Sequence, residues 1–255
     1  MKKIVAALLL ILPVFVLAQE DEKPEPGFNE ATFKGLEMRS VGPALMSGRI
    51  ADIVIDPTDP SVWYVGVGSG GVWKTVNAGT TWTPIFDDQG SYSIGCIALD
   101  PNNPNVVWVG TGENVSGRHV AYGDGVYRSR DGGKTWEKVL YRNDLTGAID
   151  LVMSPGDPDV LFAALWEFER KAWGAKTAGP EGGIWSSTDG GDTWVEITRN
   201  EGLPAGMTGR IGLAMSKADP RRVYALVDSA TQSGLYRSDD AGDTWRFVSG
   251  DANVT

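Results

Sequence analysis

Short runs of β-branched and aromatic residues recur along this chain, and segments rich in turn-forming residues separate them. Residues 62–65, 106–109 and 222–226 are such runs, and their length and composition indicate strands. The Asp-Pro-x-x-Pro segments favour turns, because Pro fixes φ and Asp accepts a hydrogen bond from nearby backbone N–H groups. The pattern therefore predicts an all-β protein with no long helix after residue 44.

Two landmarks occur four times in the same order, and together they define an internal repeat. The first is the Asp-Pro turn, which starts at Asp56 and Asp100 and, in altered form, at Ser154 and Ser216. The second has the pattern Ser/Thr-x-Asp/Asn-x-Gly-x-Thr-Trp. In this pattern Asp or Asn accepts hydrogen bonds from backbone N–H groups, and Gly adopts a positive φ. Its polar residues are Asn77, Asp131, Asp189 and Asp240, and its final residues are Trp82, Trp136, Trp194 and Trp245.

Each repeat reads as strand A, Asp-Pro turn, strand B, loop, strand C, second turn and strand D. This is a four-stranded antiparallel meander of about 50 residues, the size of one blade of a β-propeller. One such sheet cannot bury both of its faces, so the blades must stack on one another to form a core. We therefore expect four blades around one axis, with strand A innermost, the repeat Trp residues mostly buried, and blades near 44–87, 88–141, 142–199 and 200–250.

The second landmark is similar to the Asp box, or BNR repeat. In this respect the chain resembles sialidases, the xyloglucan-cleaving glycoside hydrolases, the sortilin ectodomain and bacterial sortilin-like (VPS10-type) exported proteins. The resemblance implies a β-propeller in which the Asp-box aspartates are structural. Propellers of this type usually have more than four blades, so we expect an open arc of a larger propeller whose remaining blades belong to the same protein. Residues 36–41, an extra strand D without partners of its own, favour the same interpretation.

The N-terminus carries a targeting signal rather than part of the fold. Lys2 and Lys3 precede an apolar run, residues 4–17, that is too short to span a bilayer comfortably. We therefore expect residues 1–18 to be a cleaved signal peptide and residues 19–32 to be a charged, Pro-rich flexible spacer. The protein is accordingly expected in the periplasm or outside the cell.

Net charge and residue types exclude several classes of partner and cofactor. The formal net charge is −10 and no basic patch is visible, which argues against nucleic acid, and no run after the signal peptide is apolar enough to cross a membrane. With one Cys and one His there is no zinc motif, and no phosphate loop or catalytic triad is present, so we expect no cofactor and no metal. Cys96 stands in an apolar strand and is expected to be a buried hydrophobic residue.

The longest loops follow strand B in the second and third repeats, on the face of a propeller that usually binds ligands. The polar residues of the second-repeat loop are Glu113, Arg118, His119, Tyr122 and Asp124. Two interpretations are open. These residues form a polar ligand site, or Arg118 and Asp124 form an ion pair whose role is only to stabilise the loop. The third-repeat loop contributes Trp166, Arg170 and Trp173, whose rings either stack on a ligand or pack the loop onto its blade.

Two arginines, Arg49 and Arg210, each stand in a Gly-Arg-Ile segment at the start of strand A and join the ligand candidates. Sialidases bind a carboxylate with three such arginines and carry an Arg-Ile-Pro motif. Ala51 stands where that motif has Pro, which argues against a sialidase.

The resemblance to xyloglucan-cleaving enzymes implies a catalytic Asp in the first blade. Alignment of their paired glycines with Gly70 and Gly71 puts Gly68 at the position of that Asp. Glycosidases need two carboxylates, and Asp56 or Glu113 are the conceivable substitutes. The sequence therefore favours a binding or scaffold module for a protein, peptide or glycan ligand. The alternative is a xyloglucanase-like or sialidase-like glycoside hydrolase with part of its active site in the remaining blades.

Overall fold

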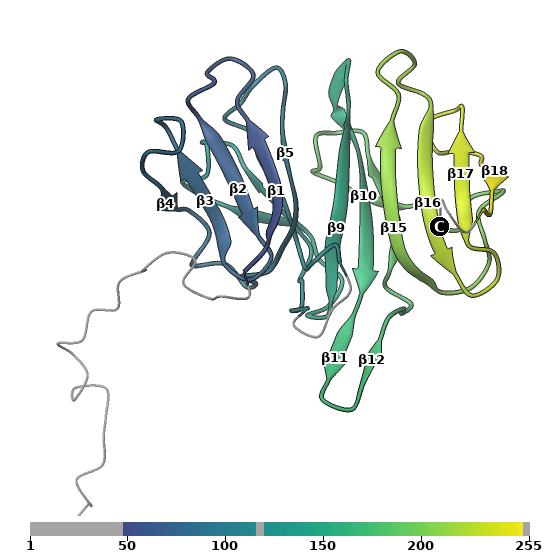
Figure 1. Cartoon of the computed structure of the whole chain (residues 1–255). Helices are drawn as coiled ribbons and strands as arrows, with labels where there is room; N and C mark the ends of the chain where they lie inside the picture. Colours follow the sequence, from purple (N-terminus) through teal and green to yellow (C-terminus); the bar gives the residue numbers. More distant parts are fainter. Residues whose placement is uncertain (1–47, 116–119, 252–255) are drawn as a thin grey trace, which may run out of the picture. The chain divides into compact units, whose positions relative to one another are not determined.

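The computed structural model describes residues 48–115 and 120–251, and every regular element in these ranges is a β-strand (Figure 1). The prediction of an all-β chain is therefore confirmed for this part of the protein. No helix that could cross a membrane occurs in it. The expectations for residues 1–32 and 36–41 lie outside the described residues.

The four repeats form four antiparallel sheets of four strands, which we number as blades in chain order. Blade 1 contains β1 (Ile50–Ile55), β2 (Trp63–Val67), β3 (Gly71–Thr75) and β4 (Thr83–Pro84). Blade 2 contains β5 (Ile94–Leu99), β6 (Val107–Thr111), β7 (Val126–Ser129) and β8 (Glu137–Leu140). Blade 3 contains β9 (Thr146–Ser154), β10 (Asp157–Glu167), β13 (Gly183–Ser187) and β14 (Val195–Glu196). Blade 4 contains β15 (Thr208–Met215), β16 (Val223–Ser229), β17 (Gly234–Ser238) and β18 (Arg246–Ser249).

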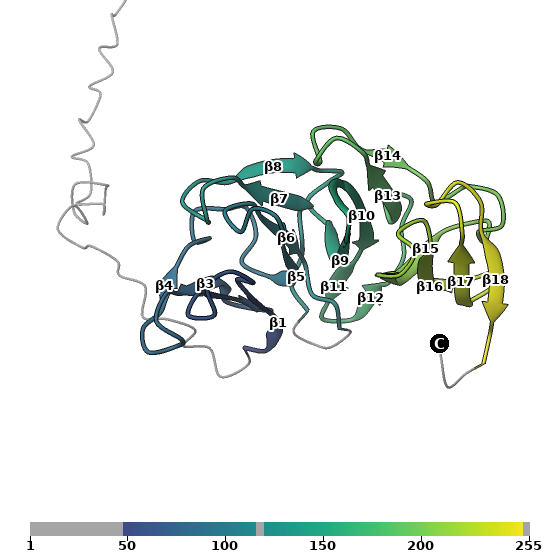
Figure 2. The same cartoon turned by 90° about the horizontal axis from the view of Figure 1, so that it is seen from above.

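The first strand of each blade lies innermost, as the repeat predicts. β1 contacts β5, β5 contacts β9, and β9 contacts β15, so these strands line the concave side of an arc. Figure 2 shows the four sheets fanning out from this inner row, with β4, β8, β14 and β18 at the outer edge. The described residues therefore form an open arc of propeller blades.

Blade 3 departs from the other blades in two connections. Its A–B turn is a tight hairpin in which Ser154 pairs with Asp157, whereas blades 1 and 2 use a longer turn that Asp56 and Asp100 close with their carboxylates. Its B–C loop contains a second hairpin, formed by β11 (Glu169–Lys171) and β12 (Gly174–Lys176). This β11–β12 hairpin extends beyond the end of the blade 3 sheet (Figure 1).

The Asp box closes the C–D turn through one carboxylate and one hydroxyl group. In blade 3, Asp189 accepts hydrogen bonds from the backbone N–H of Thr193 at 2.9 Å and from its hydroxyl at 2.6 Å. The Ser187 hydroxyl donates to Asp189 and accepts from the N–H of Gly191 at 2.9 Å. These bonds, those from Thr193 first, lower the pKa of Asp189 to about 2. Blades 2 and 4 repeat the arrangement, and blade 1 makes it with Asn77.

The hydrophobic core lies between the blades rather than within any one of them. An aromatic side chain of strand B packs against the Asp-box glycine of the next blade, as Trp108 does with Gly191 and Phe162 with Gly242. A Cβ at residue 191 would lie 2.3 Å from the Trp108 ring, and a Cβ at residue 242 would lie 3.0 Å from Phe162. Glycine is therefore needed there for close approach as well as for its positive φ. Blade 2 differs: a Cβ at residue 133 would lie 2.6 Å from Ile85, and Tyr64 of strand B instead donates a hydrogen bond from its hydroxyl to the Gly132 carbonyl oxygen at 3.4 Å.

The Asp-box Trp side chains are not uniformly buried, contrary to the sequence-based expectation. Trp136 packs edge-on against Phe86 of blade 1, with 5.1 Å between ring centroids, and is half-buried. Trp194 is also half-buried, and Trp245 is buried. For Trp82, which is 38 % exposed, the expectation is wrong. The reason is that the other three pack onto a preceding blade, and no preceding blade occurs among the described residues for blade 1.

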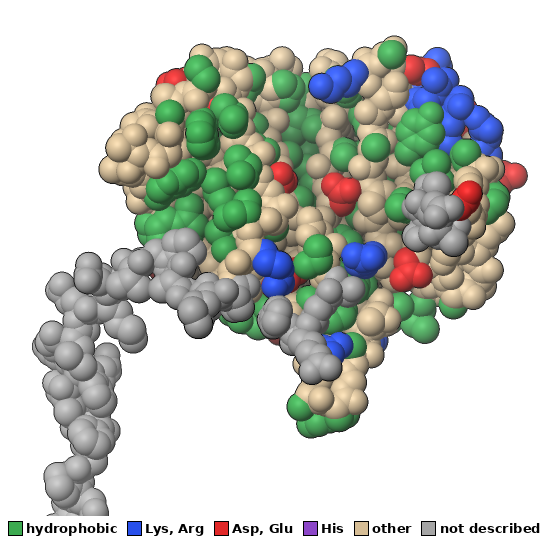
Figure 3. All heavy atoms as spheres, viewed as in Figure 1, with side chains coloured by type: hydrophobic (Ala, Val, Ile, Leu, Met, Phe, Trp, Pro, Cys, Tyr) green, Lys and Arg blue, Asp and Glu red, His purple; other side chains and the backbone are tan. Residues whose placement is uncertain are grey.

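Blade 1 exposes apolar side chains whose counterparts are buried in the other blades. Ile53 is 51 % exposed, whereas the equivalent Ile97, Leu151 and Leu213 are buried. Figure 3 shows hydrophobic side chains gathered over β1 to β3. This side of blade 1 therefore has the apolar character of a blade–blade interface.

Substitution of Asp189 separates the hydrogen bonds of the Asp box from its charge. Asp189→Asn keeps the groups that Asn77 uses in blade 1, so we expect a small loss of thermal stability, and Asp189→Ala should lower the melting temperature further. Because the folded-state pKa is lowered, the carboxylate stabilises the fold above about pH 4, and this stabilisation is lost as the pH falls towards 2. Circular dichroism melting curves should show the difference between wild type and Asp189→Asn shrinking over that range. A difference that is the same at neutral pH and near pH 2 would contradict this account.

Gly191→Ala tests the contact between blades 2 and 3. The backbone of Gly191 has a φ of +81°, and the new methyl group would overlap the Trp108 ring. We expect the free energy of unfolding in urea to fall by roughly 2–4 kcal/mol. Gly156→Ala is the matched control, because nothing lies within 4 Å of a Cβ at that position, and its effect should be about 0.5 kcal/mol or less. Equal effects of the two substitutions would show that the ring does not constrain the Asp box.

Candidate functional site

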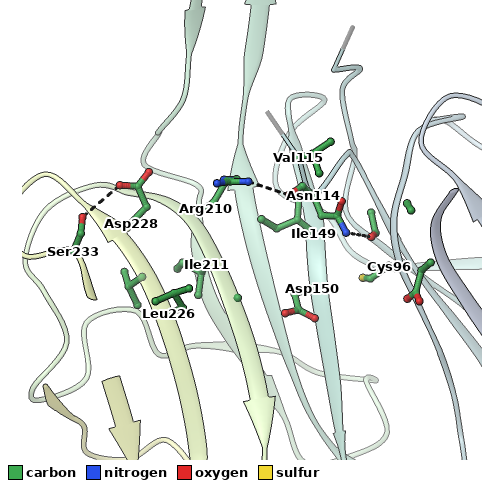
Figure 4. Close-up of a pocket in the computed structure, with 15 residues that line it drawn as sticks. Cys96, Asn114, Val115, Ile149, Asp150, Arg210, Ile211, Leu226, Asp228 and Ser233 are labelled. Carbon is green, nitrogen blue, oxygen red and sulfur yellow. Dashed lines mark hydrogen bonds between the residues drawn. The ribbon is translucent and has the colours of Figure 1, made fainter. Parts of the chain in front are cut away.

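A cavity of about 730 Å³ lies on the concave side of the arc. Residues of β1, β5, β9, β15 and β16 line it, so all four blades contribute to its wall (Figure 4). Its charged side chains are Asp52, Asp150, Arg210 and Asp228. We call this site the concave cavity.

A β-bulge gives the carboxylates of Asp52 and Asp150 their direction. In β1 and in β9, one residue before the Asp is left out of the pairing with the next strand, and such a bulge re-aims the neighbouring side chain. Asp52 Oδ2 accepts a hydrogen bond from the N–H of Ile97 at 2.9 Å, and Asp150 Oδ2 accepts one from the N–H of Leu213 at 2.7 Å. Each carboxylate therefore joins the inner strand of its own blade to that of the next blade.

Cys96 stands at the equivalent position of blade 2, also directly after a bulge. Its thiol is buried, as the sequence predicts, and Sγ lies 3.7 Å from the carbonyl oxygen of Ala148 in blade 3. Burial raises the pKa of the Cys96 thiol well above its usual value, and the carboxylates of Asp150 and Asp52 raise it further. The group therefore stays a neutral thiol at physiological pH and forms part of the contact between blades.

Burial also raises the pKa of the Asp150 carboxyl group. The N–H groups of Leu213 and Leu151 oppose this rise, and the negative charge of Asp52 adds to it. A carboxyl group whose pKa is raised in a cavity is a candidate proton donor. Asp150 thus combines a structural contact with the electrostatic character of a reactive group.

Arg210 and Asp228 are the most exposed charged groups of the concave cavity. Arg210 Nη1 donates a hydrogen bond to the carbonyl oxygen of Asn114 at 3.2 Å and so reaches from β15 to the blade 2 loop (Figure 4). Asp228 accepts a long hydrogen bond, 3.5 Å, from the Ser233 hydroxyl. The two side chains therefore offer a charged donor and a charged acceptor to a ligand in the cavity.

Glu113, the first polar residue of the blade 2 loop, is buried instead of open to a ligand. Its carboxylate forms an ion pair with Arg49 and accepts a hydrogen bond from the Ser69 hydroxyl at 3.3 Å. It also lies against Gly68, where a Cβ would be 3.3 Å from the Glu113 carboxyl carbon. A carboxylate of blade 2 therefore occupies the space beside Gly68.

The same loop contains a second buried carboxylate, Asp124, and an exposed ring, Tyr122. Asp124 accepts hydrogen bonds from the Tyr127 hydroxyl at 2.7 Å and the Thr111 hydroxyl at 3.0 Å, and its ion pair with Lys138 spans 2.5 Å. These internal partners hold the loop to its blade. Tyr122, by contrast, is 44 % exposed.

The two Trp residues predicted in the blade 3 loop have opposite environments, and Trp166 lies in β10 instead of in the loop. Trp166 is buried, packs on Phe168, and donates its Nε1 hydrogen to the Thr177 carbonyl oxygen at 2.7 Å, so it fixes the loop to its blade. Trp173 lies between β11 and β12 and is 86 % exposed. Arg170 on β11 is exposed as well.

The predicted ligand residues therefore do not come together in one site. Those with internal partners are the buried Glu113, Asp124 and Trp166 and the half-buried Arg49. Those exposed on the loop face are Tyr122, Arg170 and Trp173. Arg210 lines the concave cavity. Arg118 and His119 lie outside the described residues, so their role stays a prediction. No group of three or more His, Cys, Asp or Glu side chains in residues 48–115 and 120–251 is placed to hold a metal ion.

Sequence reasoning missed three carboxylates of the concave cavity, Asp52, Asp150 and Asp228. The repeat alignment could have indicated two of them. Asp52 and Asp150 occupy the same position of their repeats, just before the apolar part of strand A, and Cys96 occupies it in the second repeat. The bulge that turns these side chains towards the next blade leaves no mark in the residue pattern.

Comparison with known proteins agrees with the repeat and the fold. A family model described as BNR/Asp-box repeat matches residues 127–138, the second Asp box. The chain is similar to a xyloglucanase from Acetivibrio thermocellus, with 26 % identity over 225 residues that cover 77 % of this chain and 25 % of that enzyme. A xyloglucanase from Hypocrea jecorina is 28 % identical over 230 residues, which cover 78 % and 26 % of the two chains. The chain thus spans about a quarter of the length of these relatives.

Solved structures show the same kind of fold. The chain superimposes on an ancestral GH74 enzyme with a TM-score of 0.62 and 22 % identity, over 81 % of this chain and 25 % of that chain. The GH74 xyloglucanase from Xanthomonas campestris gives a TM-score of 0.55 and 24 % identity, over 80 % and 31 %. These likenesses support the assignment of the four sheets as propeller blades.

Asp150 allows a test of the contact between β9 and β15. Its raised pKa means that the charged carboxylate costs stability in the folded state at neutral pH, and this cost disappears as the pH falls below the raised pKa. Asp150→Asn keeps an acceptor for the N–H of Leu213 without the charge, so stability at pH 7 should be unchanged or higher. Asp150→Ala leaves that N–H without a partner and should cost about 1–3 kcal/mol.

Urea unfolding of both variants, with NMR titration of the Asp150 carboxyl carbon, checks this account. A titration midpoint at or below 3.8, the ordinary value of an Asp, or an Asn variant as unstable as the Ala variant, would contradict it.

Proposed function

We propose that this chain forms part of a glycoside hydrolase that binds an uncharged polysaccharide of the xyloglucan type in the concave cavity. The observation that carries the proposal is the similarity to two xyloglucanases over more than three quarters of the chain. The cavity supports it, because inner strands of four blades surround one space with both polar and apolar walls.

The charges of the concave cavity favour a ligand without negative charge. Three carboxylates face one guanidinium group there, so an anionic ligand would meet net repulsion. The exposed pair, Arg210 and Asp228, matches the alternating donor and acceptor character of sugar hydroxyl groups. The half-buried Leu226 and the exposed Val115 supply apolar surface for the C–H faces of a sugar ring.

Hydrolysis of a glycosidic bond needs an acid and a second carboxylate. Asp150, whose pKa is raised, is the candidate proton donor within the described residues, and the exposed Asp228 is the candidate second carboxylate. Both line the concave cavity. Hydrolysis by this chain is therefore proposed to depend on Asp150 and Asp228.

A second candidate function is glycan or protein binding without hydrolysis. Gly68 favours it, because this residue replaces the Asp that the resemblance implies, and the nearby Glu113 carboxylate is engaged in an ion pair with Arg49. The likeness to sortilin-type proteins belongs to this candidate and stays a prediction.

We further propose that the blades function within a larger exported propeller. The exposed apolar side of blade 1 supports a further blade as its neighbour, because the equivalent Ile97, Leu151 and Leu213 are buried against preceding blades. Export rests on the apolar N-terminal residues 4–17 with their two preceding lysines.

Calorimetric titration with xyloglucan oligosaccharides and a reducing-sugar assay on xyloglucan test binding and hydrolysis separately. Arg210→Ala should weaken binding by about tenfold or more, because a charged hydrogen-bond donor is lost. Asp228→Asn should abolish hydrolysis and leave oligosaccharide binding measurable. Asp243→Asn, an exposed carboxylate in the Asp box of blade 4, is the matched control and should change neither quantity.

The outcomes distinguish the two candidate functions. Binding that depends on Arg210 without any release of reducing sugar would select the non-hydrolytic function. Wild-type protein that neither binds nor cleaves xyloglucan would rule out the proposed substrate class.

A further inference from the structure

Three exposed aromatic rings stand on the loop face, away from the concave cavity. Tyr92, in the connection from blade 1 to blade 2, is 51 % exposed, and Tyr122 in the blade 2 loop is 44 % exposed. Their rings lie edge-on with 6.3 Å between centroids. Trp173 on the β11–β12 hairpin is 86 % exposed, more than twice the exposure of any other described Trp.

Arg170 connects these rings into one surface. A hollow of about 410 Å³ is lined by Tyr92, Tyr122 and Arg170, and a second hollow of about 580 Å³ is lined by Arg170 and Trp173. Because Arg170 belongs to both walls, the two hollows adjoin. We call this surface, made by Tyr92, Tyr122, Arg170 and Trp173, the aromatic track.

The hairpin that carries Trp173 is held at its base. The buried carboxylate of Glu167 pairs with Lys176 and accepts a hydrogen bond from the N–H of Glu181 at 3.1 Å. Trp166 donates to the Thr177 carbonyl oxygen at 2.7 Å, directly after β12. A ring presented on a supported hairpin loses little conformational freedom when a ligand stacks on it, which favours binding.

The residues beside Trp173 leave its ring accessible. Ala172 and Gly174 flank it, and neither has a side chain large enough to cover the indole. Arg170 has no ion-pair partner in the described chain, so its guanidinium can donate to a ligand. A large exposed ring with a free donor beside it is typical of a binding surface.

The mixture of aromatic and polar residues on this surface favours a polysaccharide over a protein partner. A stable protein interface buries about 800 Å² on each side around a contiguous apolar centre. Here the polar Glu169 and Arg170 lie between a pair of rings, Tyr92 and Tyr122, and the single ring of Trp173 along the two hollows. Separate rings with polar groups between them match the repeating apolar faces and hydroxyl edges of a pyranose chain.

We propose that the aromatic track is a second glycan-binding surface, on which the rings of Trp173 and Tyr122 stack against separate pyranose rings of an uncharged polysaccharide, while Tyr92, edge-on to Tyr122, lines the same hollow. Arg170 hydrogen-bonds to hydroxyl groups of the same chain. This inference rests on the proposed function for the identity of the ligand as a glycan. It adds a surface on the loop face that holds the polymer independently of the concave cavity.

Fluorine NMR of protein labelled with 5-fluorotryptophan tests the aromatic track directly. Trp173→Phe assigns the Trp173 resonance, because that signal alone is lost. Titration with xyloglucan oligosaccharides should shift this resonance and leave the Trp82 resonance, assigned by Trp82→Phe, unchanged. A Trp173 resonance that none of xyloglucan, cello-, manno- and xylo-oligosaccharides shifts would overturn the proposal.

Affinity measurements by calorimetry give a second readout. Trp173→Ala, Tyr122→Ala and Tyr92→Ala should each weaken binding of a long oligosaccharide by roughly threefold to tenfold, whereas Tyr122→Phe, which keeps the ring, should bind like wild type. Trp82→Ala is the matched control for an exposed Trp elsewhere and should have no effect. Unchanged affinity in all three Ala variants contradicts the track.

The two proposals can fail separately. A shift of the Trp173 resonance with a glycan other than xyloglucan would support the track and contradict the proposed substrate class. Loss of oligosaccharide binding in Arg210→Ala, together with a Trp173 resonance that no oligosaccharide shifts in the wild-type protein, would support the concave cavity and contradict the aromatic track.

Discussion

The contact between a strand-B ring and the Asp-box glycine of the next blade is the constraint on which the rest of the structure depends. Neither of the two blades that make this contact has a hydrophobic core of its own, because each blade is a single sheet with two faces to cover. Trp108 and Phe162 fill the space that a side chain at residue 191 or 242 would need. The Asp box therefore does two things at once: it closes the C–D turn and presents a bare backbone surface to the preceding blade. This packing sets the angle between neighbouring blades and hence the curvature of the arc.

The curvature in turn brings the inner strands close enough for side chains to join them. Asp52, Cys96 and Asp150 each reach the backbone of the next blade from the same repeat position. These groups face the concave cavity, so the side chains that hold the blades together also give the cavity its negative charge. Blade 4 has Gly212 at this position, and there the exposed Arg210 and Asp228 provide the polar surface instead. Each of the first three blades thus contacts the next blade through this position, and the exposed charge of the cavity lies on the fourth blade.

The sequence was informative where structure is local and uninformative where it depends on a neighbour. The Asp boxes, the strand order and the inner position of strand A follow from short motifs and their repetition. Trp82 has the same motif as Trp245, yet their burial differs because only the latter packs onto a preceding blade. The sequence predicts Trp166 and Trp173 in one loop, but Trp166 lies in β10, where it is buried, packs on Phe168 and donates a hydrogen bond to Thr177. The direction of Asp150 depends on a bulge that strand pairing alone determines.

A crystal structure of the protein with a bound xyloglucan oligosaccharide tests the central claim most directly. If the packing of the blades shapes a glycan site, sugar density should lie on the concave side, within hydrogen-bond distance of Arg210 and Asp228. A structure in which sugar density is absent from that side, or is confined to the outer strands β4, β8, β14 and β18, would contradict the account.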